Sequence, residues 1–161
     1  MISIIAAVSN KNVIGNKGEI PWNLSRDMKH FATITKGHKV VMGKNTYESI
    51  VKKLGHPLPQ RENFVLAKED FDAPECKILK SIEEIFELAK NEEIFIIGGA
   101  MVYKQMVPFA DKIYLTLVDI DCEGDTFFPE FNKNDYRLTS SEHVLKDEKN
   151  IYDCTFNLYE K

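Results

Sequence analysis

The chain has 161 residues, 43% hydrophobic and 29% charged, which is typical of one soluble globular domain with a substantial core. Its net charge of -4 argues against nucleic acid as a partner, because phosphate backbones are bound by basic surfaces. No apolar run is long enough to cross a membrane, and the opening MISIIAAVSN lacks the basic flank and cleavage site of a signal peptide.

The three cysteines, Cys76, Cys122 and Cys154, are far apart, and the four histidines show no metal-ligand spacing. We therefore expect a reduced, cytoplasmic protein without a metal site. No repeat, low-complexity tract or linker divides the chain, so we expect a single domain over residues 1–161.

In the first half of the chain, strands and helices alternate. ISIIAAVS is a short apolar run typical of a strand buried on both faces. A loop from Asn10 to Leu24 follows, and then a helix that begins after Ser25, a good N-cap residue. HKVVMG is predicted to be a strand, NTYESIV a helix directly behind Gly43, and NFVLA and CKIL two further strands.

The second half continues this alternation and then changes. Ser81 and Glu84 form a capping-box pattern at the start of a helix in SIEEIFELAKN. EIFIIGG is a buried strand, AMVYKQMV a helix ended by Pro108, and KIYLTLV another strand. YRLTSSEHVL and YDCTFNLYEK then read as an antiparallel hairpin. This order predicts a mostly parallel α/β sheet with helices on both faces, whose ligands bind at the carboxyl ends of the strands.

Two strand-to-helix turns contain glycine where a ligand would need close access to the backbone. In IFIIGGAMVY a buried strand ends in Gly98-Gly99 and a helix follows at once. The turn is either an anion site at a helix N-terminus or simply a tight connection. VVMGKNT repeats the arrangement at Gly43, with Lys44 and Thr46 able to meet phosphate. Two such turns favour a dinucleotide, although the Rossmann pattern G-x-G-x-x-G is absent.

Asp27 lies on the same helix face as Phe31, within an apolar stripe. An acid in the first turn of a helix is often a solvated residue favoured by the helix dipole. The alternative is that Asp27 binds a cationic or amide-like ligand edge inside a pocket. Arg61 could likewise bind a substrate carboxylate through its guanidinium or face solvent. Trp22 could belong to the core or to the rim of the pocket.

Seven collinear stretches together resemble the dihydrofolate reductase family, and the match runs from end to end. They are ISIIAAVSNKNVIG, IPWNLSRDMKHF, VVMGKNTYESI, PLPQREN, IFIIGGAMVY, KIYLTLV and EGDTFFPEF. The resemblance implies a mixed, mostly parallel eight-stranded sheet with about four flanking helices and an antiparallel C-terminal edge hairpin.

The resemblance also implies transfer of a hydride from NADPH to C6 of 7,8-dihydrofolate, with protonation of N5. Asp27 would bind the 2-amino group and N3 of the pterin through a charge-assisted pair, Thr116 would bridge Asp27 and substrate, and a water would deliver the proton. Arg61 would clamp the carboxylate of the glutamate tail. The remaining pocket walls would be Ile5, Ala6, Met28, Phe31, Ile50, Leu58, Ile97 and Tyr103.

For the cofactor, the resemblance implies a path across the two glycine turns and under a loop that closes over the nicotinamide, with Trp22 at its end. Lys44, which stands where an arginine is common, and Lys68 would meet the 2′-phosphate. EGDTFFPEF would support the loop. The implied cofactor residues are Ala7, Ile14, Gly15, Asn16, Gly18, Glu19, Ile20, Gly43, Lys44, Asn45, Thr46, Leu66, Ala67, Lys68, Gly98, Gly99, Ala100, Met101, Val102, Tyr103 and Thr126.

Two other functions remain as alternatives at this point. One is a reductase of another pterin or of a riboflavin precursor on the same fold, and the other is a non-catalytic nucleotide-binding module. Asp27 on an apolar face argues against the second, because an unused buried carboxylate is costly. Dihydrofolate and antifolate inhibitors are the expected small-molecule partners, and we expect a monomer.

Overall fold

A computed structural model describes all residues, 1–161, and its centre is one eight-stranded sheet in the order β5-β4-β3-β6-β1-β7-β10-β9. The strands from β5 to β7 in this order are parallel, whereas β10 is antiparallel to both β7 and β9. The predicted parallel sheet with an antiparallel closing hairpin is therefore confirmed. The strands are β1 (Ile2–Val8), β3 (Lys39–Gly43), β4 (Glu62–Leu66), β5 (Lys77–Leu79), β6 (Ile94–Gly98), β7 (Lys112–Val118), β9 (Arg137–Val144) and β10 (Cys154–Glu160).

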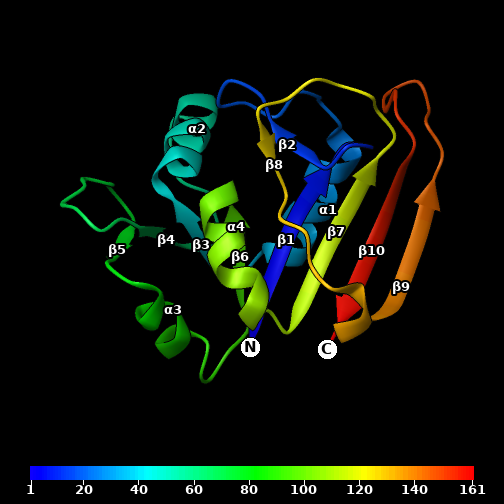
Figure 1. The fold of residues 1–161 in the computed structure, drawn as a ribbon. Helices are drawn as coiled ribbons and strands as arrows, with labels where there is room; N and C mark the ends of the chain where they lie inside the picture. Colours follow the sequence, from blue (N-terminus) through cyan, green and yellow to red (C-terminus); the bar gives the residue numbers. More distant parts are fainter.

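Four helices cover the two faces of the sheet, as expected. Figure 1 shows α4 in front of the sheet and α1 behind it. Neighbouring residues of β1 point to opposite faces, so Ile4 belongs to the core under α3 and α4, and Ile5 to the core under α1 and α2. The helices are α1 (Ser25–Thr35), α2 (Lys44–Leu54), α3 (Ile82–Leu88) and α4 (Ala100–Met106).

Two predicted helix boundaries are wrong. Ser25 is the first residue of α1 and not its cap, and Leu24, which occupies the capping position, contributes no side-chain hydrogen bond. The helix α4 ends at Met106, and Pro108 lies in the following 3-10 turn, η1 (Val107–Phe109), where its missing N–H costs little. By contrast, the capping box of Ser81 and Glu84 is present at the start of α3.

A second, two-stranded sheet is present that the sequence did not predict. It pairs β2 (Val13–Gly15), inside the predicted loop, with β8 (Thr126–Phe127), far along the chain. Strands of two and three residues are too short to show a period-two pattern. A short 3-10 turn, η2 (Lys133–Asp135), was missed for the same reason.

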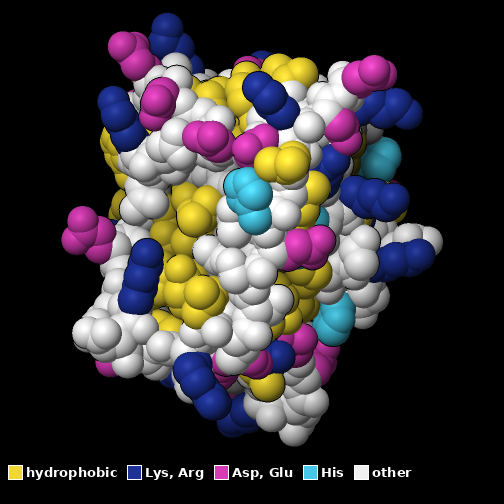
Figure 2. All heavy atoms as spheres, turned by 90° about the vertical axis from the view of Figure 1, so that its right-hand side faces the viewer, with side chains coloured by type: hydrophobic (Ala, Val, Ile, Leu, Met, Phe, Trp, Pro, Cys, Tyr) yellow, Lys and Arg dark blue, Asp and Glu magenta, His cyan; other side chains and the backbone are white.

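The strand β9 forms one edge of the central sheet and is exposed along most of its length. Figure 2 looks onto this side of the molecule and shows charged side chains of both signs, with hydrophobic side chains visible on either side of a polar strip. Charges on an edge strand, here Arg137 and Glu142, discourage pairing with another chain. No helix of the molecule has the length and apolar character needed to cross a membrane.

Candidate active site

The two glycine turns predicted from the sequence lie next to each other. Gly43 ends β3 and Gly98 ends β6, and these strands are neighbours in the sheet, with Met42 opposite Gly98. The helix α2 starts at Lys44 and α4 at Ala100, directly after the turns. The free N–H groups of two helix N-termini therefore meet at one edge of the sheet, where they favour an anion.

The turns leave no room for side chains. A Cβ atom at Gly43 would lie 3.1 Å from Cγ2 of Val102 and 3.8 Å from the backbone nitrogen of Gly99. A Cβ atom at Gly98, whose φ is +137°, would lie 3.1 Å from Oγ1 of Thr46. A side chain at either turn would therefore have to displace Val102 or Thr46 by a few tenths of an ångström, and at Gly98 the positive φ also favours glycine.

The sheet opens between β1 and β6 at the same edge. Pairing of β1 with β6 ends at Ile4, opposite Ile96, whereas pairing of β1 with β7 continues to Val8. Just past the last pair, the carbonyl of Ile5 accepts a hydrogen bond of 2.8 Å from the buried hydroxyl of Tyr103. The chain leaves β1 toward α1 and leaves β6 toward α4, on opposite faces, so this opening is the topological switch point where ligands bind in such sheets.

Asp27 lies in the first turn of α1 and is only partly exposed. Burial raises the pKa of its carboxyl, and a hydrogen bond from the hydroxyl of Thr116, on β7, opposes that rise. Burial and the charge of Asp27 also raise the pKa of the Tyr103 hydroxyl. Asp27 is therefore not a fully solvated helix-start acid, because its carboxyl is largely buried near Thr116 and Tyr103.

Trp22 belongs to the core. It is 8% exposed and packs in a small cluster with Leu24, Val118 and Cys154. Leu24 precedes α1, and Val118 and Cys154 are paired residues of β7 and β10. This cluster fixes the chain that leads into α1, and so the position at which Asp27 enters the site.

Arg61 lies against the other end of α1. Its Nη1 donates to the hydroxyl of Thr35 at 3.3 Å, its Nε donates to the carbonyl of Pro59 at 2.9 Å, and the guanidinium lies 5.8 Å from the ring centre of Phe31. Burial lowers the pKa of Arg61, and no acid of the chain forms an ion pair with it. Eight residues of helix, about 12 Å along its axis, separate Asp27 from Thr35. The helix thus presents a carboxylate near one end and an unpaired arginine at the other.

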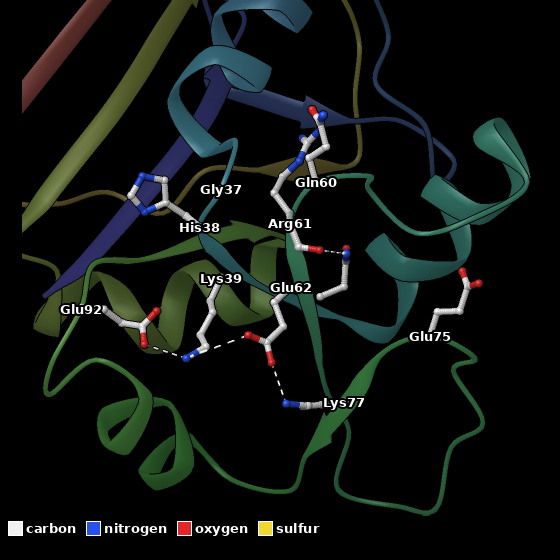
Figure 3. Close-up of a pocket in the computed structure, with 10 residues that line it drawn as sticks. Gly37, His38, Lys39, Gln60, Arg61, Glu62, Glu75, Lys77 and Glu92 are labelled. Atoms are coloured by element: carbon white, nitrogen blue, oxygen red, sulfur yellow. Dashed lines mark hydrogen bonds and ion pairs between the residues drawn. The ribbon is translucent and has the colours of Figure 1, made fainter.

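Arg61 also borders a polar groove of about 560 Å³ at the opposite edge of the sheet. In Figure 3 the guanidinium of Arg61 points away from the charged side chains that line this groove. Those charges already satisfy one another, since Lys39 pairs with Glu92 at 2.6 Å and Lys77 with Glu62 at 2.6 Å. The only charged side chain that lines the groove without an ion pair, apart from Arg61 itself, is the carboxylate of Glu75, so the groove offers no unpaired cation other than Arg61.

The loop that follows β2 packs against the segment before β8. The carboxylate of Asp125 accepts a hydrogen bond of 3.0 Å from the backbone of Lys17, and the backbone of Asp125 donates to the carbonyl of Gly15 at 3.2 Å. A Cβ atom at Gly124 would lie only 2.1 Å from Cγ1 of Val13. EGDTFFPEF thus directly contacts residues Ile14 to Ile20, the loop expected to close over the nicotinamide and called the 14–20 loop below, as the resemblance implies.

The remaining apolar residues of the predicted substrate pocket lie in three environments. Most pack together in the core beneath α1 and α2, namely Ile5, Phe31, Ile50, Leu58 and Ile97. Ala6 instead packs against the core on the other face. Met28 on α1 is 53% exposed, and Ile20, which is one of the predicted cofactor residues, is 58% exposed. Large apolar side chains open to water are consistent with a surface that a ligand covers.

The remaining cofactor residues are arranged around the glycine turns. Leu66 is paired with Gly43, so Ala67 and Lys68 leave β4 beside the turn that starts α2. Nζ of Lys44 lies 5.1 Å from the ring centre of Phe71. Ala7 lies apart from these residues, against the Trp22 cluster. Several of the predicted cofactor residues are exposed to solvent, namely Gly18, Glu19, Lys44, Asn45, Lys68 and Met101.

Two residues near the site were missed by sequence reasoning. Phe71 contacts Lys44, and Asn150 accepts a hydrogen bond from the backbone of Arg26 in the first turn of α1. Neither belongs to a motif. Asn150 acts on a helix 124 residues away in the chain, so no local pattern could have indicated its role.

The chain is similar to known proteins along its whole length. The family model described as dihydrofolate reductase matches residues 1–161. The dihydrofolate reductase of Bacillus subtilis (strain 168) is 41% identical, with 100% of this chain and 95% of that protein covered, and that of Haemophilus influenzae is 39% identical, with 96% and 94% covered. A solved structure of dihydrofolate reductase from Enterococcus faecalis, complexed with NADP(H) and RAB-propyl, has a TM-score of 0.93 and 33% identity, covering 99% of this chain and 95% of that one.

Proposed function

The chain belongs to the dihydrofolate reductase family, and we propose that the opening between β1 and β6 is where it carries out the family's reaction. The protein is an NADPH-dependent oxidoreductase that reduces 7,8-dihydrofolate to 5,6,7,8-tetrahydrofolate. NADPH, when bound, supplies the hydride that C6 of the pterin receives. What the chain itself does is bind the two reactants, orient them and exclude water.

The glycine turns fit the pyrophosphate of the cofactor. Gly43 directly precedes α2 and Gly99 directly precedes α4, so the first N–H groups of both helices have no partner within the helix and can bind an anion. Anions bind at such helix N-termini without a positively charged side chain. Lys44 and Lys68, both exposed beside the turns, would hold the 2′-phosphate as point charges.

The observation that carries the substrate assignment is the environment of Asp27. Its carboxyl is partly withdrawn from water, receives a hydrogen bond from Thr116 and lies near Tyr103 at the opening in the sheet. An unpaired carboxylate there accepts hydrogen bonds from two adjacent donors, such as the 2-amino group and N3–H of a pterin. Asp27 would thereby orient the ring and polarise it toward protonation at N5, with Thr116 holding the carboxylate in place.

Arg61 supports a substrate with an anionic tail. Its guanidinium is partly buried and lacks an acidic partner, although desolvating a charge without pairing it is costly. A carboxylate of the bound substrate would supply that partner through a bidentate pair. Because α1 separates Asp27 from Arg61, the two groups would hold opposite ends of one extended molecule. A riboflavin precursor without such a tail would leave Arg61 unused.

The 14–20 loop would cover the reacting centre and exclude water from it. Hydrogen bonds with Asp125 would hold it at Gly15 and Lys17. The exposed side chain of Ile20 and the exposed Glu19, 4.0 Å from Lys52 of α2, place the end of this loop near the helix behind the first glycine turn. Trp22 would maintain the end of the loop from within the core.

We propose further that the chain works as a single-domain monomer in the cytoplasm. One continuous sheet runs from β1 to β10, and all the residues assigned above come from one chain. All three cysteines are free thiols, as a reducing compartment favours. Sedimentation equilibrium at assay concentration should give the mass of one chain, and a mass of two chains would contradict the monomer.

The test of the proposed site is Asp27→Asn, measured by the loss of NADPH absorbance in the presence of dihydrofolate. The amide keeps the size of the side chain but presents a donor to one of two substrate donors, so hydride transfer near neutral pH should fall by about 100-fold or more. NADPH binding, followed by fluorescence, should stay unchanged. Asp70→Asn, at a fully exposed carboxylate, is the matched control. Turnover of Asp27→Asn close to that of the control would contradict the assignment.

A further inference from the structure

The helix that carries Asp27 is capped from a distant part of the chain. Leu24, in the capping position of α1, makes no side-chain hydrogen bond. Instead, Oδ1 of Asn150, in the loop between β9 and β10, accepts hydrogen bonds from the backbone nitrogen of Arg26 at 2.9 Å and from the hydroxyl of Ser25 at 3.2 Å. The first turn of α1 thus depends on an acceptor that lies outside the helix.

Asn150 is itself held in one orientation. It is 8% exposed, and Oδ1 of Asp147 accepts hydrogen bonds from its backbone nitrogen at 2.7 Å and from its Nδ2 at 3.2 Å. The carbonyl of Asn150 in turn accepts from the backbone of Asp147 at 2.8 Å. Because the amide nitrogen donates to Asp147, the amide oxygen must face α1.

A second contact ties the same loop to the same turn. Nη2 of Arg26 pairs with Oδ2 of Asp147 at 2.6 Å, and Nη1 donates to the carbonyl of Leu145 at 2.9 Å. A cation in the first turn of a helix is disfavoured by the helix dipole, so Arg26 does not stabilise α1 as an isolated helix. The backbone N–H groups of Asn150 and Lys149 keep the pKa of Asp147 below its usual range, and the pair with Arg26 stays ionised at neutral pH.

From these contacts we infer that Asn150 is a positioning residue, which determines where the carboxylate of Asp27 lies relative to Thr116. Asp147 and Arg26 assist it by holding the loop of Asn150 on the first turn of α1. The inference rests on the role proposed above for Asp27. Asp27 directly follows Arg26, whose backbone Asn150 holds. The loop of Asn150 returns to the sheet at Cys154, and Cys154 is paired with Val118 on the strand that carries Thr116.

The neighbouring strands β7, β10 and β9 therefore support both Asp27 and Thr116. The strand β7 supplies Thr116 directly, and the β9–β10 loop, which β10 joins to β7, supplies the cap for the turn that contains Asp27. Removing the acceptor at position 150 leaves two donors of α1 without a protein partner. The first turn then loosens, the carboxylate of Asp27 moves away from Thr116, and water reaches it.

The experiment compares Asn150→Ala with Ser81→Ala, which removes the capping box of α3, a helix that carries none of the assigned site residues. Both changes remove a helix cap, and both should lower the melting temperature. Asn150→Ala alone should lower hydride transfer, by about tenfold, because small displacements at a reacting centre cost rate. The dissociation constant of NADPH should be that of the wild type, since the glycine turns are not involved.

The pH profile separates positioning from a general loss of stability. Asp27 is faced by Thr116 of β7, Tyr103 of α4 and Cys154 of β10, and burial is what raises the pKa of its carboxyl. In Asn150→Ala the ionisation seen in the rate profile should move to lower pH, because water now stabilises the carboxylate. In Ser81→Ala it should not move.

Two further variants keep the inference testable if Asn150→Ala does not fold. Asn150→Ser keeps an acceptor oxygen of a kind that caps helices and places no second carboxylate beside Asp147, so it should stay within about threefold of the wild-type rate. Asp147→Asn should shift the profile in the same direction as Asn150→Ala, by less. Wild-type rate and profile in Asn150→Ala, or equal rate losses in Asn150→Ala and Ser81→Ala, would overturn the inference. Normal turnover in Asp27→Asn would instead overturn the proposed role of Asp27.

Discussion

Replacing Gly124 by alanine tests whether the segment before β8 determines the position of the 14–20 loop. The added Cβ atom would lie 2.1 Å from Cγ1 of Val13 and 2.7 Å from the carbonyl oxygen of Gly15, whereas ordinary contacts begin at 3.4 Å. One contact is to backbone and the other to a buried side chain of β2, so neither can rotate out of the way. The two segments must therefore separate.

The separation should have two measurable effects. Overpacking of this kind costs about 1–3 kcal/mol of unfolding free energy, measurable by urea denaturation. The hydrogen bonds between Asp125 and the loop, at 3.0 and 3.2 Å, should lengthen as the loop moves. A displacement on the order of 1 Å near reacting atoms can cost about 100-fold in rate. Because the loop is a cover and not a reacting group, we expect hydride transfer in single-turnover measurements to fall by roughly tenfold.

The matched control is Gly55→Ala, at the end of α2. Nothing lies within 4 Å of a Cβ atom there, but φ is +80°, so alanine is strained by about 1 kcal/mol without any clash. This control should lose stability and keep the wild-type rate of hydride transfer. If Gly124→Ala also kept that rate, or lost no more of it than Gly55→Ala, the segment would not determine the position of the loop.

Three other expectations follow from the proposed site. Lys44→Ala should raise the dissociation constant of NADPH far more than that of NADH, and added salt should reduce the preference of the wild type for NADPH over NADH. An equal rise in both dissociation constants would place Lys44 away from the 2′-phosphate. Burial raises the pKa of Asp27 above its unfolded value of about 3.9. The carboxyl therefore ionises more easily in the unfolded chain, and the free energy of unfolding falls as pH rises past that value. Asp27→Asn should therefore have a higher urea midpoint than wild type at neutral pH, with the gap closing toward pH 3; identical midpoints at every pH would contradict this. A protonated 2,4-diaminopyrimidine offers Asp27 a charged donor pair, so its inhibition should be competitive with dihydrofolate; steady-state kinetics showing competition with NADPH would place the pocket elsewhere.

Local patterns in the sequence predicted the elements and several site residues because their physical causes are local. Continuous apolar runs predicted the strands buried under helices on both faces, and their alternation with helices predicted a mostly parallel sheet. Each glycine turn was visible as a strand followed at once by a helix. Asp27 was conspicuous because helical spacing placed a charge on an apolar face. The family also was recognisable from collinear motifs.

The sequence failed where the cause lay in a distant part of the chain. Ser25 looks like an N-cap by residue type, but the acceptor comes from Asn150, on a loop that only the β9–β10 hairpin brings to α1. The pairing of β2 with β8 likewise joins segments too short to show a pattern of their own.

The sequence by itself therefore determined the order of the strands and helices of the central sheet and the position of the glycine turns, since each depends on backbone geometry or periodicity within a few residues. Only the tertiary structure decided that Gly43 and Gly98 share one edge, that Asp27 is withdrawn from water against Thr116, and that Arg61 has no acidic partner. Strand order, burial and pairing arise from contacts between segments far apart in the chain. No local pattern encodes these contacts, because the energy of burying or pairing a side chain depends on which residues of distant segments the completed fold places against it.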